Sequence, residues 1–479
     1  MWQRHGLATA ALCVLVLSSA ATSGADPSER TSGLDEQRAV YVTAYNGGLA
    51  LVHDRRRVAL NDGMNRIAWR DVSANMDATS ALLESVDSPG SVDVLEQNFN
   101  FDLLSPQAIL EKYVGHDVEV VHDKPVPGEP RRETARLLST NDGVVLQYRD
   151  RIETQLIDSH IVYASLPASL RDRPTLVLDL ESRRSGEQDL DLSYLTRGVA
   201  WSAEYVGVVA PDERTVSLKG YVTLSNTSGT TYRDTRLQLV AGNVNVSQEP
   251  NEGQLRTIAR VTTRDQYSTL QEENYFEYHL YTLPRTTTIA DNQTKQVSLL
   301  TARNVAIHKT LELRGSASYY SNENADLGDK LKVGVYETFT NKGGDLGVPL
   351  PGGLVRLYKN DSRGSSLFLG SDRIDHTPRN EDVRLHLGDS FDVTANKKQT
   401  DFHALGNCTF DSSYAIVLGN AKDQAVDVLV VEPLPGDWSI ISENLRHRKT
   451  SSSTATWNVH VPANAHETLT YAAHVNLCF

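Results

Sequence analysis

The sequence predicts an all-β protein of several domains, and three observations lead to this fold class. Short runs of alternating apolar and polar residues recur along the chain, for example over 217–224 and 469–475, and this period of two is typical of strands with one buried face. Pairs such as Asn46-Gly47 and Asp142-Gly143 separate the runs and accept the positive φ angles of tight turns. The length of 479 residues, with 39% hydrophobic and 23% charged residues, suits about three globular domains.

The first 25 residues have the features of an export signal. Arg4 and His5 precede an apolar run over 7–17, and small residues at 23–25 offer a site for signal peptidase. The run is shorter than the roughly 20 apolar residues that a transmembrane helix needs, and no later segment of the sequence comes close. We therefore expect 1–25 to be removed from an exported product, periplasmic or secreted, with no transmembrane segment in the mature chain.

Two different units are expected in the N-terminal part of the mature chain. A small β domain is predicted over 37–104 and a second unit over 105–165. Within 105–165, Ser105 is a suitable N-cap and Pro106 a suitable first residue for a short helix that Gly115 can end. Five brief strands follow the helix, so this unit is predicted to be a helix plus a small barrel of the SH3 type.

Two Ig-like β-sandwiches are predicted in the rest of the chain, over 173–290 and 291–479. A weak internal repeat supports them, because three strands end in Asn and lead through a polar turn to another strand. These residues are Asn226, Asn341 and Asn420. An Asn side chain can bond its own backbone two residues on and so start the turn. The repeat indicates either a duplicated unit or chance alternation, and both sandwiches are expected in either case.

The charge balance and the missing motifs limit the function classes. The chain has 47 Lys and Arg against 61 Asp and Glu, a net charge of −14, and an acidic field does not attract nucleic acids. We therefore expect no nucleic-acid partner. The signatures of nucleophile elbows, zinc proteases and phosphate loops are missing from the sequence, which favours a protein without catalytic activity or cofactor, although sites can also be assembled from distant residues.

One polar cluster is the best candidate for chemistry. Carboxylates and imidazoles are the ligand types that zinc and calcium take, but their spacing here matches no established metal site, so no metal is assigned and turn or ion-pair roles are favoured. The candidate residues are Asp372, Asp375, His376, Asp401 and His403.

Cys408 and Cys478 are the two cysteines that follow the export signal. An oxidising compartment makes them a candidate disulfide. Bonded together they would close a loop of about 70 residues, which the chain-entropy treatment values at about 4 kcal/mol. Their proximity is not visible in the sequence, so the bond stays open at this point.

Several strings of the sequence are similar to those of a known family. They lie at 194–205, 237–242, 277–281, 372–378 and 399–402. They resemble an exported bacterial family built on a conserved domain of unknown function, and relatives in the mucoidy inhibitor A group carry a version of that domain. The likeness runs from about Ala39 to the C-terminus. It implies a β-rich envelope or secreted protein and supplies no catalytic residues. The mucoidy inhibitor A group has a long coiled coil within the domain, whereas sustained apolar heptads are missing here, so no capsule-related role is carried over.

Together these observations favour an exported, non-catalytic β protein of the bacterial envelope or exterior. It would bind a protein or an envelope polymer through loops and sandwich edges, where rigid β scaffolds usually place their contacts. The alternative is an extracytoplasmic hydrolase or metal-dependent enzyme with its site near Asp375 and His376, together with Asp401 and His403. The sequence leaves the oligomeric state open.

Overall fold

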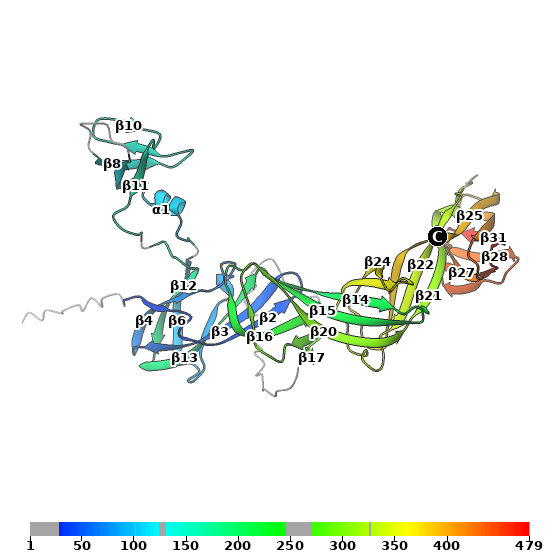
Figure 1. Ribbon diagram of the computed structural model, residues 1–479, viewed down its shortest axis with the longest axis horizontal. Helices are drawn as coiled ribbons and strands as arrows, with labels where there is room; N and C mark the ends of the chain where they lie inside the picture. Colours follow the sequence, from blue (N-terminus) through cyan, green and yellow to red (C-terminus); the bar gives the residue numbers. More distant parts are fainter. Residues whose placement is uncertain are drawn as a thin grey trace, which may run out of the picture. The chain divides into compact units, whose positions relative to one another are not determined.

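The computed structural model describes residues 28–100, 102–123, 131–167, 169–242, 244–245, 270–324 and 327–478. The predicted export signal over 1–25 lies outside the described residues. The fold is all-β, as predicted (Figure 1). The chain forms two compact units: one takes Met1–Glu36, Arg57–Arg70 and Ser85–Asp189, and the other takes Gln37–Arg56, Asp71–Glu84 and Leu190–Phe479. The predicted domain limits stay predictions.

The first unit contains a four-stranded sheet with the order β1-β4-β12-β6. One of its two inner strands, β12, carries a continuous apolar run over 176–178 that is buried on both faces, as expected for a strand with covered faces. Trp69 on β4 is fully buried beside it. The strands are β1 (Arg30–Ser32), β4 (Gly63–Arg70), β6 (Val92–Asn100) and β12 (Thr175–Ser182).

The same unit contains the predicted helix and five brief strands. The Ser105 hydroxyl accepts a hydrogen bond from the Ala108 N–H at 3.0 Å, and Pro106 begins helix α1, so the predicted helix start is confirmed. The sheet order is β10-β9-β8-β7-β11, and within the described residues its end strands do not pair with each other. The sheet is therefore open and the barrel does not close, because β9 and β10 have only three and two residues. The elements are α1 (Pro106–Lys112), β7 (Asp117–His122), β8 (Arg132–Ser139), β9 (Val145–Gln147), β10 (Ile152–Glu153) and β11 (Ser159–Val162).

The other three sheets draw mainly on the second unit. The eight-stranded sheet has the path β17-β18-β16-β2-β3-β13-β5, with β19 paired to β16, and a five-stranded sheet has the order β20-β15-β14-β23-β24. Their strands are β2 (Gln37–Tyr45), β3 (Leu49–Leu60), β5 (Leu82–Ser85), β13 (Gly186–Arg197), β14 (Val199–Val209), β15 (Thr215–Asn226), β16 (Tyr232–Ala241), β17 (Gln271–Tyr275), β18 (Tyr278–Thr282), β19 (Thr287–Ile289), β20 (Gln293–Ala306), β23 (Gly353–Asn360) and β24 (Ser366–Ile374).

The nine-stranded sheet forms the C-terminal sandwich and has the order β28-β31-β26-β25-β22-β21-β27-β30-β29. Its core contains Tyr414, Trp457 and Tyr471 with many aliphatic side chains. The strands are β21 (His308–Arg314), β22 (Leu331–Thr340), β25 (Asp382–Ala404), β26 (Thr409–Asn420), β27 (Val426–Pro433), β28 (Asp437–Glu443), β29 (Arg448–Ser451), β30 (Thr454–Val461) and β31 (Ala465–Asn476). Short 3-10 turns lie at Ala78–Ser80 and Ala317–Tyr320.

Two groups of strands in the second unit share one connectivity. β15 leads to β16, while β15 pairs with β20 and β16 pairs with β19. In the same way β26 leads to β27, while β26 pairs with β31 and β27 pairs with β30. β16 also lies parallel to β2, and β27 lies parallel to β21. The repeat seen in the sequence therefore coincides with a repeated arrangement of strands.

The predicted Asn turns are confirmed at two of the three positions. The Asn226 Oδ1 accepts from the Ser228 N–H and the Asn420 Oδ1 accepts from the Lys422 N–H, both at 3.0 Å. At Asn341 the corresponding bond comes from a backbone N–H six residues on, at 3.1 Å, because the loop there is longer. All three side chains are buried. Each amide also donates to backbone carbonyls of a second loop, which fixes two connections at once.

Cys408 and Cys478 form a disulfide, with their Cα atoms 5.2 Å apart. The bond continues a strand ladder, because Thr409 on β26 lies opposite Asn476 on β31. The Leu477 N–H also donates to the Cys408 carbonyl at 2.7 Å. The C-terminal end of the described chain is thereby tied to the start of β26.

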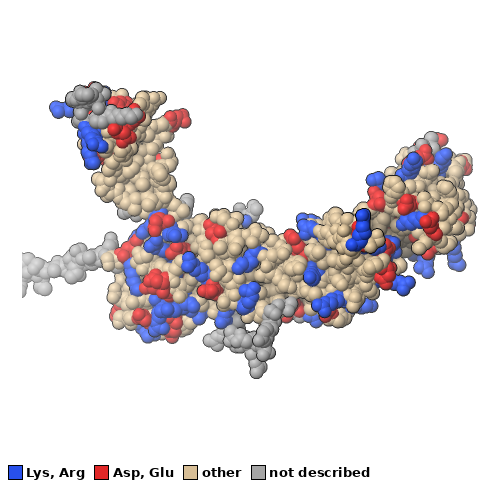
Figure 2. Space-filling view, viewed as in Figure 1, with Lys and Arg blue, Asp and Glu red and all other residues tan. Residues whose placement is uncertain are grey.

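Charged side chains of both signs mix over the surface. Figure 2 shows Lys and Arg interspersed with Asp and Glu over the visible face, and neither sign forms a broad patch there. Many of the pairs are hydrogen-bonded, for example Arg66 with Asp179 at 2.8 Å and Arg356 with Glu204 at 3.0 Å. Charges of both signs therefore lie side by side on this face. No helix within the described residues is long and apolar enough to cross a membrane.

Candidate functional site

Three of the predicted polar residues lie at the end of β24 and bond mainly to backbone. The Asp372 Oδ2 accepts from the His386 N–H at 2.7 Å. The His376 Nδ1 accepts from the Gly352 N–H at 3.1 Å, and its Nε2 lies 3.2 Å from the Asn46 amide nitrogen. Partial burial lowers the pKa of His376. Asp375 is exposed beside it. These contacts fix the turn after β24.

The other two predicted residues, Asp401 and His403, form an exposed ion pair of 3.0 Å near the end of β25. β25 is 23 residues long, and its first part pairs with β22 whereas its last part pairs with β26. Asp372 contacts the first part, so the five residues fall into two separate places. Among the described residues no group of three or more His, Cys, Asp or Glu side chains is placed to hold a metal ion.

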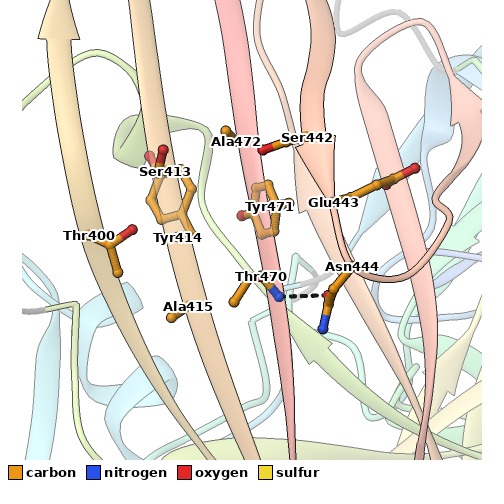
Figure 3. A pocket seen from close by; sticks show the side chains of 10 residues that line it. All are labelled: Thr400, Ser413, Tyr414, Ala415, Ser442, Glu443, Asn444, Thr470, Tyr471 and Ala472. Atoms are coloured by element: carbon orange, nitrogen blue, oxygen red, sulfur yellow. Dashed lines mark hydrogen bonds between the residues drawn. The ribbon is translucent and has the colours of Figure 1, made fainter.

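A pocket lies on the C-terminal sheet, beside Asp401. It has a volume of about 340 Å³ and spans four adjacent strands, in the order β28-β31-β26-β25 (Figure 3). Its lining residues come from all four strands, and most of them have small side chains. They are Thr400, Ser413, Tyr414, Ala415, Ser442, Glu443, Asn444, Thr470, Tyr471 and Ala472.

Strand alternation explains which side chains form the floor of the pocket. Along β26, Tyr414 and Ile416 are buried in the sandwich, whereas Ser413 and Ala415 face outward and are half-buried. β31 alternates in the same way and is paired to β26 residue by residue, with Ala472 opposite Ser413. The outward face of a sheet usually carries long polar side chains, so a row of small residues leaves it hollow.

Two β-bulges flank the hollow. The register of β25 shifts between Gln399 and Asp401, which makes Thr400 the extra residue, and the register of β28 shifts between Ile440 and Ser442. A bulge bends its strand and increases the local twist. The outer two strands of the pocket are therefore bent beside the hollow, whereas β26 and β31 pair without a register shift.

The pocket presents free hydroxyl groups. Within the described part of the chain, the side-chain hydroxyls of Thr400, Ser413, Ser442 and Thr470 have no hydrogen-bond partner and can bond a ligand. Asn444, by contrast, is fixed: its Oδ1 accepts from the Thr470 N–H at 2.9 Å and its Nδ2 donates to the Thr468 carbonyl at 2.7 Å. Figure 3 shows the first of these two bonds.

The rim of the pocket carries two His–Asp pairs. Asp401, paired with His403, lies opposite Ser413 in the strand register. One step further along the sheet, the His474 Nδ1 lies 2.6 Å from the Asp411 Oδ1. Of the five predicted residues, Asp401 lies next to the lining residue Thr400, and His403 lies two residues further along β25. Neither lines the pocket, and the residues of its floor were missed by the sequence prediction. The signal that could have found the floor is the recurrence of Ser, Thr and Ala at every second position of two neighbouring strands.

A buried ion pair holds the sandwich beneath the pocket. The Lys397 Nζ donates to both carboxylate oxygens of Glu432 at 2.7 Å, and the two side chains are 2% and 0% exposed. The Tyr320 hydroxyl donates to the same carboxylate at 2.8 Å and lies 2.8 Å from the Tyr471 hydroxyl. Burial lowers the pKa of Lys397. The network fixes Tyr471, a pocket residue, from the core side.

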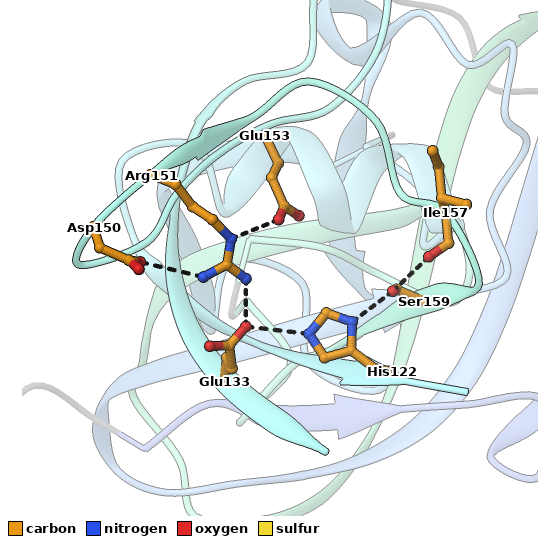
Figure 4. Close-up of polar contacts among 7 residues, drawn as sticks. All are labelled: His122, Glu133, Asp150, Arg151, Glu153, Ile157 and Ser159. Atoms are coloured by element: carbon orange, nitrogen blue, oxygen red, sulfur yellow. Dashed lines mark hydrogen bonds and ion pairs between the residues drawn. The ribbon is translucent and has the colours of Figure 1, made fainter. Parts of the chain in front are cut away.

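A second polar cluster joins three strands of the small five-stranded sheet (Figure 4). The two ring nitrogens of His122 lie 2.9 Å from the Ser159 hydroxyl and 3.2 Å from the Glu133 carboxylate. Arg151 donates to Glu133 at 2.5 Å, and this bond lowers the pKa of Glu133. The Ser159 hydroxyl donates to the Ile157 carbonyl at 2.8 Å. Since that hydroxyl proton is used locally, the cluster ties β7, β8 and β11 together without a free nucleophile.

Comparison with known families places the pocket inside a recognised domain. A family described as a domain of unknown function, DUF4139, matches residues 190–478. Comparison with curated proteins gives no match. The matched range includes all four strands that line the pocket, together with the disulfide and the buried Lys397–Glu432 pair. Because the match covers more than half of the chain, this protein belongs to the DUF4139 family.

Proposed function

We propose that this chain is an exported protein of the bacterial envelope or exterior and that it binds a partner molecule, without transforming it, in the pocket of its C-terminal sheet. The observation that carries the proposal is a hollow lined by free hydroxyls on a face that would otherwise carry long solvated side chains. Rigid β scaffolds commonly place their binding sites on such concave surfaces.

Two features support export. The segment over 1–25 has the basic start, short apolar run and small residues of an export signal. The Cys408–Cys478 bond is of a kind that persists in oxidising compartments. Fractionation of the native host tests this part, and we expect a mature chain that begins near Asp26 outside the cytoplasm. Full-length chain in the cytosol would contradict it.

The hydrolase alternative needs Asp375, His376, Asp401 and His403 to act together. Asp375 and His376 follow β24, whereas Asp401 and His403 lie on the last part of β25, so no shared centre supports that reaction. Binding is therefore the function we retain, and the partner is a protein or an envelope polymer.

Capture of envelope components by the mature chain tests the binding function. Ala472→Arg places a long side chain in the pocket, and Val417→Arg is the matched control, since Val417 faces outward on β26 but does not line the pocket. We expect the wild-type chain and the control to retain the same envelope component and the pocket variant to lose it. Equal capture by all three chains would contradict binding in this pocket.

A further inference from the structure

We infer that the pocket takes a neutral, polyhydroxylated ligand, that is, a short segment of a glycan, and this inference rests on the proposed binding function. The free hydroxyls of Thr400, Ser413, Ser442 and Thr470 come from four adjacent strands. A hydroxyl group donates one hydrogen bond and accepts up to two. A surface of such groups matches a ligand whose own groups both donate and accept, and sugar hydroxyls are that chemical class.

The charges around the pocket favour a neutral ligand. Asp401 and Asp411 on the rim each have a histidine partner. Glu443 lines the pocket, but its Oε2 accepts from the Trp457 indole N–H and from the His447 backbone and side chain at 2.9–3.0 Å. Lys398 also lies on this face, opposite Ala415, and is exposed. A charged ligand would give up its water shell for little compensation on the floor.

The strands that line the floor disfavour an added peptide strand. β26 and β31 are each paired on both sides in the sheet, so their backbone groups are already bonded. A peptide that binds by strand addition needs a free sheet edge, and this floor offers side chains instead. The volume of about 340 Å³ is near the lower end of small-molecule pockets, roughly 300–1,000 Å³. It suits a short segment rather than a folded partner.

The aromatic residues of the pocket indicate that a glycan segment binds there weakly. Tyr414 and Tyr471 are 1% and 2% exposed, so their rings are not available for stacking on a sugar. Hydrogen bonds then supply most of the affinity, and each replaces a bond to water. Removing hydroxyls one at a time should therefore lower the affinity in small steps, whereas filling the pocket should abolish binding.

The test is a calorimetric titration of the mature chain with three probes: a neutral glucose oligosaccharide, a neutral N-acetylglucosamine oligosaccharide and an acidic uronic acid oligosaccharide. We expect at least one neutral probe to bind and the acidic probe to bind more weakly. Ala472→Arg should lower the affinity at least tenfold, and Val417→Arg should leave it unchanged. Ser413→Ala combined with Thr470→Val, which keeps the side-chain volumes close to the original, should lower it about three- to tenfold.

Three results would overturn the inference: no binding of either neutral probe, tighter binding of the acidic probe through Lys398, or equal binding by the pocket and control variants. If Ala472→Arg does not fold, as judged by circular dichroism, the Ser413→Ala/Thr470→Val pair decides the question alone. The two proposals fail separately. If the pocket variants lose envelope capture but no neutral saccharide binds, the proposed binding function stands and the inference of a glycan ligand is refuted.

Discussion

Replacing Glu337 by Gln is expected to stabilise the protein at alkaline pH and to have little effect near pH 5. Glu337 lies on β22 and is 4% exposed, and within the described residues its Oε2 has no hydrogen-bond partner. Burial raises its pKa from 4.5 to about 7, against a smaller opposing effect of Lys309. Lys309 lies opposite Glu337 in the strand register but is bonded to Glu213.

The size and sign of the effect follow from proton binding. Between pH 4.5 and about 7 the folded protein holds a proton on Glu337 that the unfolded chain has lost, so the free energy of unfolding falls as the pH rises. At about 1.36 kcal/mol per pH unit, the difference amounts to at most about 3 kcal/mol. The loss is complete above about pH 7. The Glu337→Gln variant carries no charge and should gain up to this amount at pH 8.5.

The assay is chemical denaturation of the mature chain at pH 5 and pH 8.5, followed by far-ultraviolet circular dichroism. Glu312→Gln is the matched control, because Glu312 on the adjacent strand β21 is 5% exposed but accepts from Arg384 at 2.6 Å and from Arg314 at 3.1 Å. That variant should destabilise the protein at both pH values, since it weakens two arginine pairs. A Glu337→Gln variant with the same stability change at both pH values would refute the reasoning.

Three further predictions concern stability. Lys397→Met leaves Glu432 buried without its cation and should lower the free energy of unfolding by about 3–5 kcal/mol. Adding Glu432→Met should recover most of that loss. Urea denaturation measures both variants, and a double variant no more stable than Lys397→Met would speak against the pairing. Replacing Cys408 and Cys478 by Ser should lower the free energy of unfolding by about 4 kcal/mol, given their separation of 70 residues. Thiol titration of the oxidised, denatured wild-type protein should find no free thiol from this pair. Two free thiols per chain would contradict the disulfide. The arginine partner of Glu133 lowers the pKa of that carboxyl, so the pair stabilises the small sheet fully at pH values above the ordinary pKa of Glu and loses this effect as the pH falls through the lowered pKa. Glu133→Gln should therefore speed hydrogen exchange in β7 and β8 at pH 7. Unchanged exchange in these strands would count against the stabilising role of the pair.

Local patterns in the sequence were enough to predict the fold class, the start of one helix and two of the turns. Alternating runs specify strands because successive side chains point to opposite faces. Ser105 and Pro106 specify the start of α1 because an N-cap hydroxyl bonds a backbone N–H three residues on. Asn226 and Asn420 specify their turns for a similar reason, since the bonded group lies two residues away. In each case the interacting atoms belong to neighbouring residues.

The site depended on contacts between residues far apart in the chain. Asp401 and Asp372 are close in sequence, but the long strand β25 passes from β22 to β26 and so separates their surroundings. Closure of the predicted small barrel over 105–165 also depended on whether the end strands of its sheet, β10 and β11, pair with each other. The pocket required Ser413 and Ala472 to come opposite each other on β26 and β31. Strand register is set by which faces are buried against the rest of the sandwich.

The sequence by itself determined an all-β chain with alternating buried faces, capped turns and a low density of reactive motifs, because those properties depend on neighbouring residues. Only the tertiary structure decided that two bulged strands flank a row of Ser, Thr and Ala and leave a hydroxyl-lined hollow. The physical reason is that a bulge and a register are fixed by packing against distant strands, and no local preference of the residues at 400 or 441 encodes that packing.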